Sequence, residues 1–157
     1  MTSLAMPVMA DDPSDDIDLL CARGDADADL GRYPAALASY WAAWDLLPEP
    51  KLDSEKATWI LAAVGDVNFL GGDYEAGRDN LSTVMHCPGA IGIAFLHFRL
   101  GQCHYELGNE AQAADELLRA LLGGGAALFD DEDPKYLACA ERAEAAAPAH
   151  KAWRFWD

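Results

Sequence analysis

Histidine and cysteine side chains in the middle of the chain are the first candidates for chemistry. His97 and His104 lie seven residues apart, Cys103 directly precedes the second, and His86 and Cys87 are adjacent upstream. A metal-dependent or redox enzyme could use such donors, but metal ligands on one helix favour spacings of three or four residues. We therefore interpret His97 and His104 as partly buried structural histidines, and we expect no metal and no cofactor.

Two further motifs have the composition of a ligand loop but lack its spacing. The acidic run at 130–133, DDED, has neither the alternating ligands nor the glycine of a calcium loop. We expect a solvated loop in which Asp133 caps the following helix. The run Gly123–Gly125 is not followed by the Lys-Ser/Thr of a phosphate-binding loop, and the chain has no nucleophile elbow. The sequence therefore predicts that this protein is not an enzyme.

Charge and cysteine usage restrict the partners and the compartment. The 157 residues include 27 Asp and Glu but only 11 Lys and Arg, giving a formal net charge of −16. This charge argues against binding to nucleic acid or to an anionic membrane, and it favours a basic protein partner or serves only solubility.

Four cysteines without CxxC spacing indicate a reduced, cytoplasmic protein. No secretory signal and no membrane-spanning stretch are recognisable.

Residues 96–121 contain the clearest structural pattern in the chain. Apolar residues recur there at helical spacing, which predicts two antiparallel helices joined by a tight turn. Gly108 lies where the first helix should end. Gly101 lies inside that helix, where glycine costs about 1 kcal/mol relative to alanine, so we expect close approach of the partner helix at this point.

The same pair of glycines occurs twice more, as Gly24 with Gly31 and Gly65 with Gly72. Each second glycine is followed five residues later by a small residue and four residues after that by a large apolar one. These large residues are Tyr40, Leu81 and Leu117. The chain therefore contains an internal repeat.

This repeat resembles the tetratricopeptide repeat (TPR), a helix–turn–helix unit of about 34 residues. The resemblance implies an all-α fold: an α-α superhelix of three helical hairpins followed by a capping helix. The expected repeats cover about 17–50, 58–88 and 94–125, with the capping helix at 134–146. They form one TPR domain at 14–147, between a flexible lead at 1–13 and an aromatic tail at 148–157.

Helix boundaries follow from capping residues, prolines and glycines. We expect Ser14 or Asp15 to cap the first helix, and Asp53 or Ser54 to cap the third. Arg23 and Asp27 replace the apolar residues of the family pattern, so the first repeat should be looser. The seven expected helices are 14–30, 34–47, 54–70, 74–85, 90–107, 110–122 and 134–146.

In repeats of this family, the first helices of successive units line a concave groove. Carried over by register, the groove positions are Asp18, Cys21, Asp25, Ala28 and Asp29 in the first copy, Trp59, Ala62, Asp66, Phe69 and Leu70 in the second, and Phe95, Phe98, Gln102, Tyr105 and Glu106 in the third. A groove that combines carboxylates with rings is typical of protein-binding surfaces. The alternative for any one of its phenylalanines, or for Trp59, is an ordinary core position.

One well-known function within the family is excluded by residue type. A TPR subgroup binds the acidic tails of heat-shock chaperones through Lys, Arg and Asn side chains in the groove. The corresponding positions here hold Asp25, Asp66, Cys21, Ala62 and Phe98. The charge is reversed, and that co-chaperone function is not expected.

The stretches WILAAVGD–FLGGDYEAG, CPGAIG–AFLHFRLGQC–ELGNEAQAADEL and EDPKY resemble small bacterial TPR proteins that act as immunity partners of polymorphic toxins. This resemblance implies a cytoplasmic inhibitor that binds and neutralises a basic toxin domain. The alternative is a chaperone of the type III secretion kind, or a general TPR adaptor, that holds a partner segment in its groove.

The tail carries Trp153, Phe155 and Trp156 within four residues. These rings either fold back on the last helix or form an exposed contact patch.

Overall fold

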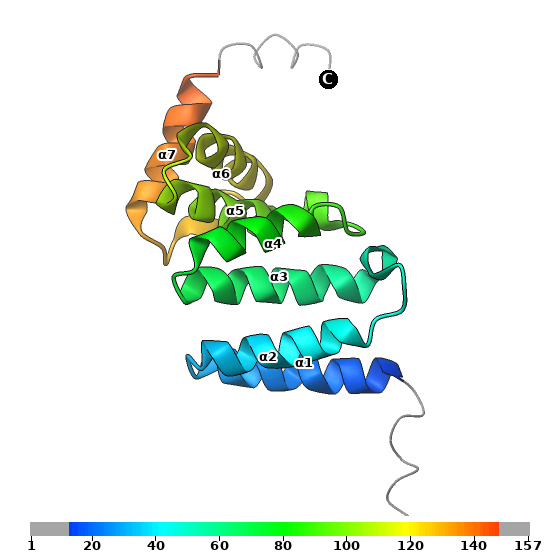
Figure 1. Cartoon of the computed structure of the whole chain (residues 1–157). Helices are drawn as coiled ribbons and strands as arrows, with labels where there is room; N and C mark the ends of the chain where they lie inside the picture. Colours follow the sequence, from blue (N-terminus) through cyan, green and yellow to red (C-terminus); the bar gives the residue numbers. More distant parts are fainter. Residues whose placement is uncertain (1–12, 148–157) are drawn as a thin grey trace, which may run out of the picture. The chain divides into compact units, whose positions relative to one another are not determined.

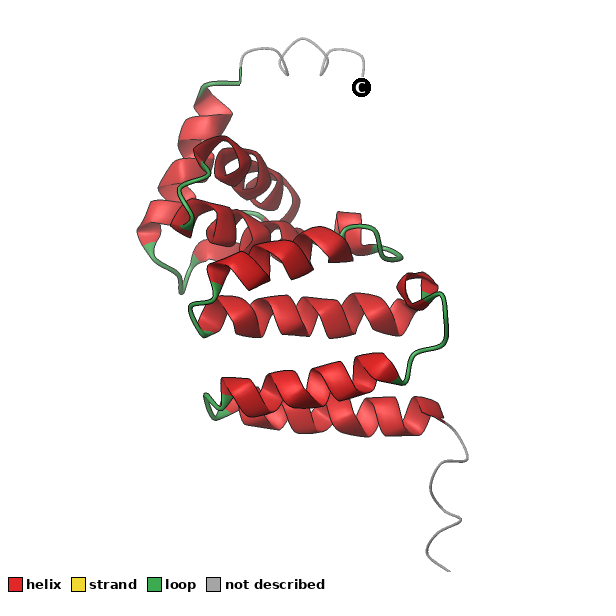
Figure 2. Ribbon diagram, viewed as in Figure 1, coloured by secondary structure: helices red, strands yellow, loops and turns green. Residues whose placement is uncertain are grey.

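The computed structural model describes residues 13–147, and in this range the chain is helical with no β-strand (Figures 1 and 2). The predicted all-α fold is confirmed. The helices are α1 (Pro13–Asp29), α2 (Tyr33–Asp45), α3 (Glu55–Leu70), α4 (Tyr74–Val84), α5 (Ala94–Glu106), α6 (Glu110–Gly124) and α7 (Pro134–Ala145), with short 3-10 turns η2 (Lys51–Asp53), η3 (Ala90–Gly92) and η4 (Ala126–Phe129). The lead at 1–12 and the tail at 148–157 lie outside the described residues. No helix in 13–147 is both long and apolar enough to cross a membrane.

The helices pair as successive antiparallel hairpins within two compact units. The N-terminal unit ends at Ala90, and in it α1 packs on α2, α2 on α3, and α3 on α4. The C-terminal unit begins at Ile91, and in it α5 packs on α6 and α6 on α7, with η4 against α6 and α7. The single domain expected over 14–147 stays a prediction.

The second glycine of each repeated pair ends the first helix of a hairpin. Gly31, Gly72 and Gly108 have φ angles of 74°, 83° and 81°. This left-handed backbone strains any residue with a side chain, and glycine adopts it without that cost. The predicted turn glycines are confirmed.

The first glycine of each pair lies at a close helix–helix contact, as predicted. In each hairpin the large apolar residue of the second helix packs directly over this glycine. A Cβ atom would lie 2.5 Å from Tyr40 Cε1 at Gly24, 2.4 Å from Leu81 Cγ at Gly65, and 2.7 Å from Leu117 Cγ at Gly101. These distances are far below van der Waals contact, so only glycine fits without a shift.

The first repeat is the least buried of the three, in agreement with the looser packing expected there. Helix α1 buries only Ile17 and Gly24, whereas α3 buries nine residues. Arg23 is exposed where the other two copies bury Val64 and Leu100. A charged residue at this position removes apolar contact area, and with it the main stabilising contribution to packing.

The helix ends agree with the predictions at two places and differ at three. Ser54 caps α3, and Asp133 caps α7 by accepting from the Lys135 amide at 3.0 Å. Helix α6 continues to Gly124 rather than ending at 122, and Gly125 is its C-cap. The predicted cap of the first helix is wrong, because α1 already includes Pro13 and its first turn contains Ser14. Proline has the right φ for a first helical turn. The fifth helix begins at Ala94 rather than 90, because η3 precedes it.

Candidate functional site

In the N-terminal unit the predicted site residues lie on α1 and α3. We call this set the acidic–aromatic face. It comprises Asp18, Asp25 and Asp29 of α1 with Trp59, Asp66 and Phe69 of α3. The α1 carboxylates are exposed, the Trp59 side chain is 61% exposed, and Asp66 and Phe69 are half-buried. Each helix repeats its members at intervals of 4, 7 or 3 residues, which keeps them on one side of that helix.

Tyr40 of α2 binds one carboxylate of this face. Its ring is buried over Gly24, and its hydroxyl donates to Asp25 Oδ1 at 2.7 Å. Burial raises the pKa of Tyr40 far above its ordinary value, and the hydrogen bond and negative charge of Asp25 and the charge of Asp66 add to this shift. The phenol therefore stays protonated and holds the Asp25 carboxylate in place.

Lys56 supplies a cation at one end of the face. Its ammonium group pairs with Asp18, which joins the start of α3 to α1. The side chains of Asp18 and Lys56 are 67% and 37% exposed, so solvent screens the pair and it contributes little to stability. It compensates one of the four carboxylates, so the face keeps a net negative charge.

In the C-terminal unit two of the predicted groove residues are inaccessible. Phe98 is 1% exposed and packs edge-on against Phe129 of η4, with ring centroids 4.7 Å apart. Gln102 is fully buried, and its amide donates to Glu132 Oε1 at 2.8 Å. The direct partner contact expected of both residues is wrong in this structure, because the segment after α6 covers them. For Phe98 the alternative of an ordinary core position holds.

The buried side chain of Arg99 binds the segment after α6 to α5. The Arg99 guanidinium donates to Gln102 Oε1 at 2.7 Å and to Glu132 at 3.4 Å, and it stacks 5.1 Å from the centre of the Phe95 ring. The solvated acidic loop expected at 130–133 is therefore wrong for Glu132, which faces α5. One sequence signal could have indicated this network: Arg99 stands among apolar residues in the most hydrophobic part of α5, and a buried charge requires a partner.

Two of the remaining predicted residues of α5, Tyr105 and Glu106, are held by the capping helix α7. Lys135 Nζ lies 2.8 Å from Glu106 Oε2, and the Tyr136 hydroxyl donates to the same oxygen at 2.5 Å. Burial alone would raise the pKa of Glu106, but the hydrogen bonds from Lys135 and Tyr136 outweigh it and hold this pKa below its ordinary value. The rings of Tyr105 and Tyr136 meet edge to face at 5.3 Å. Phe95 keeps an exposed edge.

The histidines have structural partners, as predicted. His97 is buried, with Nδ1 2.6 Å from Glu116 Oε1 and Nε2 2.8 Å from the Ile91 carbonyl oxygen. Both ring nitrogens of His97 therefore have a polar partner within the C-terminal unit. His104 Nδ1 lies 3.2 Å from the Asn109 amide nitrogen. Within residues 13–147 no group of three or more His, Cys, Asp or Glu side chains has the arrangement of a metal site.

Comparisons with known proteins identify the fold. No protein-family model matches the chain, and no curated protein matches it. Among solved structures it is similar to PcrH in complex with the chaperone binding region of PopD, with a TM-score of 0.61 and 22% identity over 94% of this chain and 99% of that one. It is also similar to MamA in two crystal structures, with TM-scores of 0.60 and 0.59, 16% identity, 87% of this chain covered, and 82% and 77% of those chains. At these identities the similarity shows a TPR-like helical fold and nothing finer.

Proposed function

We propose that this protein is a non-enzymatic TPR-like module that binds a protein partner through the acidic–aromatic face, and that the bound part of the partner is basic. The observation that carries the proposal is the 61% exposed Trp59 side chain on α3, the helix that also carries Asp66, together with the exposed Asp25 and Asp29 on α1. An exposed aromatic anchor with charged neighbours has the composition of a docking surface. Carboxylates at such a surface attract Lys and Arg side chains and accelerate association.

Two biological roles are consistent with binding through the acidic–aromatic face. We propose a cytoplasmic location for both. A chaperone that holds an extended partner segment is supported by the similarity to PcrH, which was crystallised with the chaperone binding region of PopD. An immunity protein that neutralises a basic toxin domain is supported by the resemblance of the repeat sequences and by the net charge of −16. The structural similarity favours the first form.

The charge of the face is the property to test. Replacing Asp25 and Asp66 together with asparagine removes two charges but keeps an acceptor for the Tyr40 hydroxyl. We expect the affinity for the partner to fall about tenfold or more, and its dependence on salt to weaken, because close charge pairs contribute roughly 1.5 kcal/mol or more. The partner is first isolated from the native host with the immobilised wild-type chain and identified by mass spectrometry, and its affinity is then measured by calorimetry.

A matched control removes the same charge elsewhere. Glu75 and Glu141 are exposed on α4 and α7, and their joint replacement with glutamine should leave the affinity unchanged. Equal affinities of the two double variants would exclude the acidic–aromatic face as the binding site. A short peptide from the partner that binds as tightly as the whole partner indicates the chaperone form, whereas inhibition of a folded, toxic domain indicates the immunity form.

A further inference from the structure

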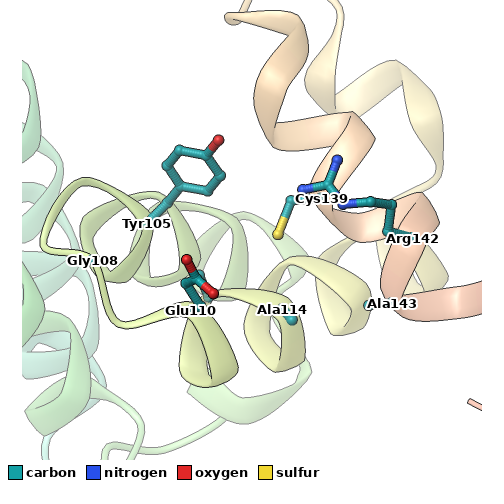
Figure 3. Close-up of a pocket in the computed structure, with 8 residues that line it drawn as sticks. Tyr105, Gly108, Glu110, Ala114, Cys139, Arg142 and Ala143 are labelled. Atoms are coloured by element: carbon teal, nitrogen blue, oxygen red, sulfur yellow. The ribbon is translucent and has the colours of Figure 1, made fainter. Parts of the chain in front are cut away.

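Two places on the C-terminal unit could receive something other than a helix of this chain. One is a pocket of about 470 Å³ between the turn that joins α5 to α6 and the capping helix α7 (Figure 3). Its lining holds both the Glu110 carboxylate and the Arg142 guanidinium, so its charge favours no single class of ligand. The other is the side of α5 beneath residues 126–133, which we call the covering segment. Here the chain itself shows which chemistry the surface accepts.

The side of α5 beneath the covering segment combines aromatic rings with a cation. The ring centroids of Phe95 and Phe98 lie 6.4 Å apart, and the Arg99 guanidinium lies 5.1 Å and 5.9 Å from them. Rings attract a further ring in an edge-to-face arrangement, and a guanidinium forms charge-assisted hydrogen bonds with a carboxylate. This surface therefore favours an occupant that brings one ring and one carboxylate.

The covering segment supplies these two groups at a spacing of three residues. Phe129 packs edge-on against Phe98, with ring centroids 4.7 Å apart. The Glu132 carboxylate accepts from the Gln102 amide at 2.8 Å and from Arg99 at 3.4 Å. Phe129 is the one buried residue among the eight of the segment, and five of them are exposed. One ring and one carboxylate thus account for these contacts with α5.

Local features of the covering segment allow it to leave α5 as a loop. Its backbone hydrogen bonds within the described residues are local: the Leu128 N–H donates to the Gly125 oxygen at 3.2 Å, and the Glu132 N–H to the Phe129 oxygen at 3.2 Å. Three glycines at 123–125 precede the segment, and glycine changes its backbone angles at little steric cost. Release therefore breaks side-chain contacts but leaves the backbone of α5 unchanged.

We propose that this side of α5 is a docking surface for a partner segment that carries an aromatic residue followed three residues later by Asp or Glu. The covering segment occupies the surface when the partner is absent. The partner's ring replaces Phe129 against Phe98, and its carboxylate replaces Glu132 beside Arg99. A covered site binds with an affinity reduced in proportion to the fraction of chains that are uncovered. The covering segment therefore rejects sequences that match the surface poorly.

A peptide copied from the covering segment tests this proposal on the full-length chain. The probe is fluorescein-labelled AALFDDED, and fluorescence polarisation measures its affinity. Probe and protein are both acidic, so general charge attraction does not favour their binding. We expect the double variant Phe129→Ala with Glu132→Ala to bind the probe at least about tenfold more tightly than the wild type, because its surface is uncovered. The control probe AALADDAD lacks the ring and that carboxylate and should not bind.

Single variants keep the test decisive if the double variant does not fold, which circular dichroism checks. Glu132→Ala retains the Phe129 ring and should give an affinity between those of the wild type and the double variant. Asp131→Ala, at the exposed neighbouring position, should bind the probe as the wild type does. Equal affinities of Glu132→Ala and Asp131→Ala, or equal binding of the two probes, would overturn the proposal.

Photo-crosslinking locates the bound probe. In a second form of the probe, p-benzoylphenylalanine replaces the phenylalanine of AALFDDED, and peptide mass spectrometry identifies the residue to which it attaches in Glu132→Ala and in the double variant. We expect attachment on α5 around Phe98. Attachment only to other helices would contradict docking at this surface.

Discussion

At the scale of single residues, the fold depends on glycines that admit a larger partner. Gly101 allows Leu117 to approach so closely that its Cγ would lie 2.7 Å from a Cβ. Leu117 is fully buried beneath this contact. The gain in packing between α5 and α6 therefore exceeds the roughly 1 kcal/mol that a glycine costs inside a helix.

Replacing Gly101 with alanine tests this balance. Helix propensity alone would stabilise the variant, but the added methyl group overlaps Leu117, and overpacking typically costs about 1–3 kcal/mol. We expect a net loss in the free energy of unfolding, measured by urea titration with circular dichroism.

The same substitution at Gly123 is the control. Gly123 lies inside α6, and a Cβ there would make an ordinary 3.5 Å contact with Ala94. This variant should be neutral or more stable by up to about 1 kcal/mol. If Gly101→Ala were also stabilising, the close approach would not be the reason for the glycine.

The Glu106 carboxylate gives a pH-dependent prediction. Its folded-state pKa is lowered by the hydrogen bonds from Lys135 and Tyr136, so it contributes stability above the unfolded-state pKa. This contribution is lost as the pH falls from the ordinary glutamate value of 4.5 through the lower folded-state value. We expect the melting temperature of the wild type to fall more steeply below about pH 4.5 than that of Glu106→Gln. Glu144→Gln, at an exposed position of α7, should keep the wild-type slope.

At the scale of elements, the segment after α6 decides which part of α5 a partner can reach. Turn η4 places Phe129 on Phe98, and the following loop brings Glu132 to Gln102 and Arg99. The helical spacing of α5 indicates which residues share a side, but it does not indicate what covers that side. The segment 126–133 thus buries Phe98 and Gln102, which were predicted to line the groove.

Removal of the Glu132 carboxylate should loosen this cover. Glu132→Ala deprives the buried Gln102 amide of its acceptor and removes the carboxylate next to Arg99, which we expect to cost about 1–3 kcal/mol of unfolding free energy. Asp131→Ala, at an exposed neighbouring position, should change it by less than about 0.5 kcal/mol. Chemical denaturation of both variants measures the difference. Similar stabilities would mean that the loop does not hold α5.

At the scale of the whole molecule, charge and fold have separate consequences. The helical repeat arises from apolar contacts and glycine turns in each hairpin, and it would form with many surface sequences. The net charge of −16 does not define this fold, but it determines which partners are attracted. The proposed binding function therefore depends on where the carboxylates lie, and above all on those of α1 and α3.

The sequence alone was sufficient for the helices, their pairing and the turns. These features depend on short-range regularities: apolar spacing, a glycine at each left-handed turn, and a small residue opposite a large one. Asp25 and Trp59, two of the predicted groove residues, are exposed, and their role in binding stays a prediction. Only the tertiary structure decided that Phe98 and Gln102 are buried, that Glu132 faces Arg99, and that a pocket remains beside α7. Those outcomes depend on how a segment some thirty residues later in the chain folds over α5, and local periodicity carries no information about contacts between such distant segments.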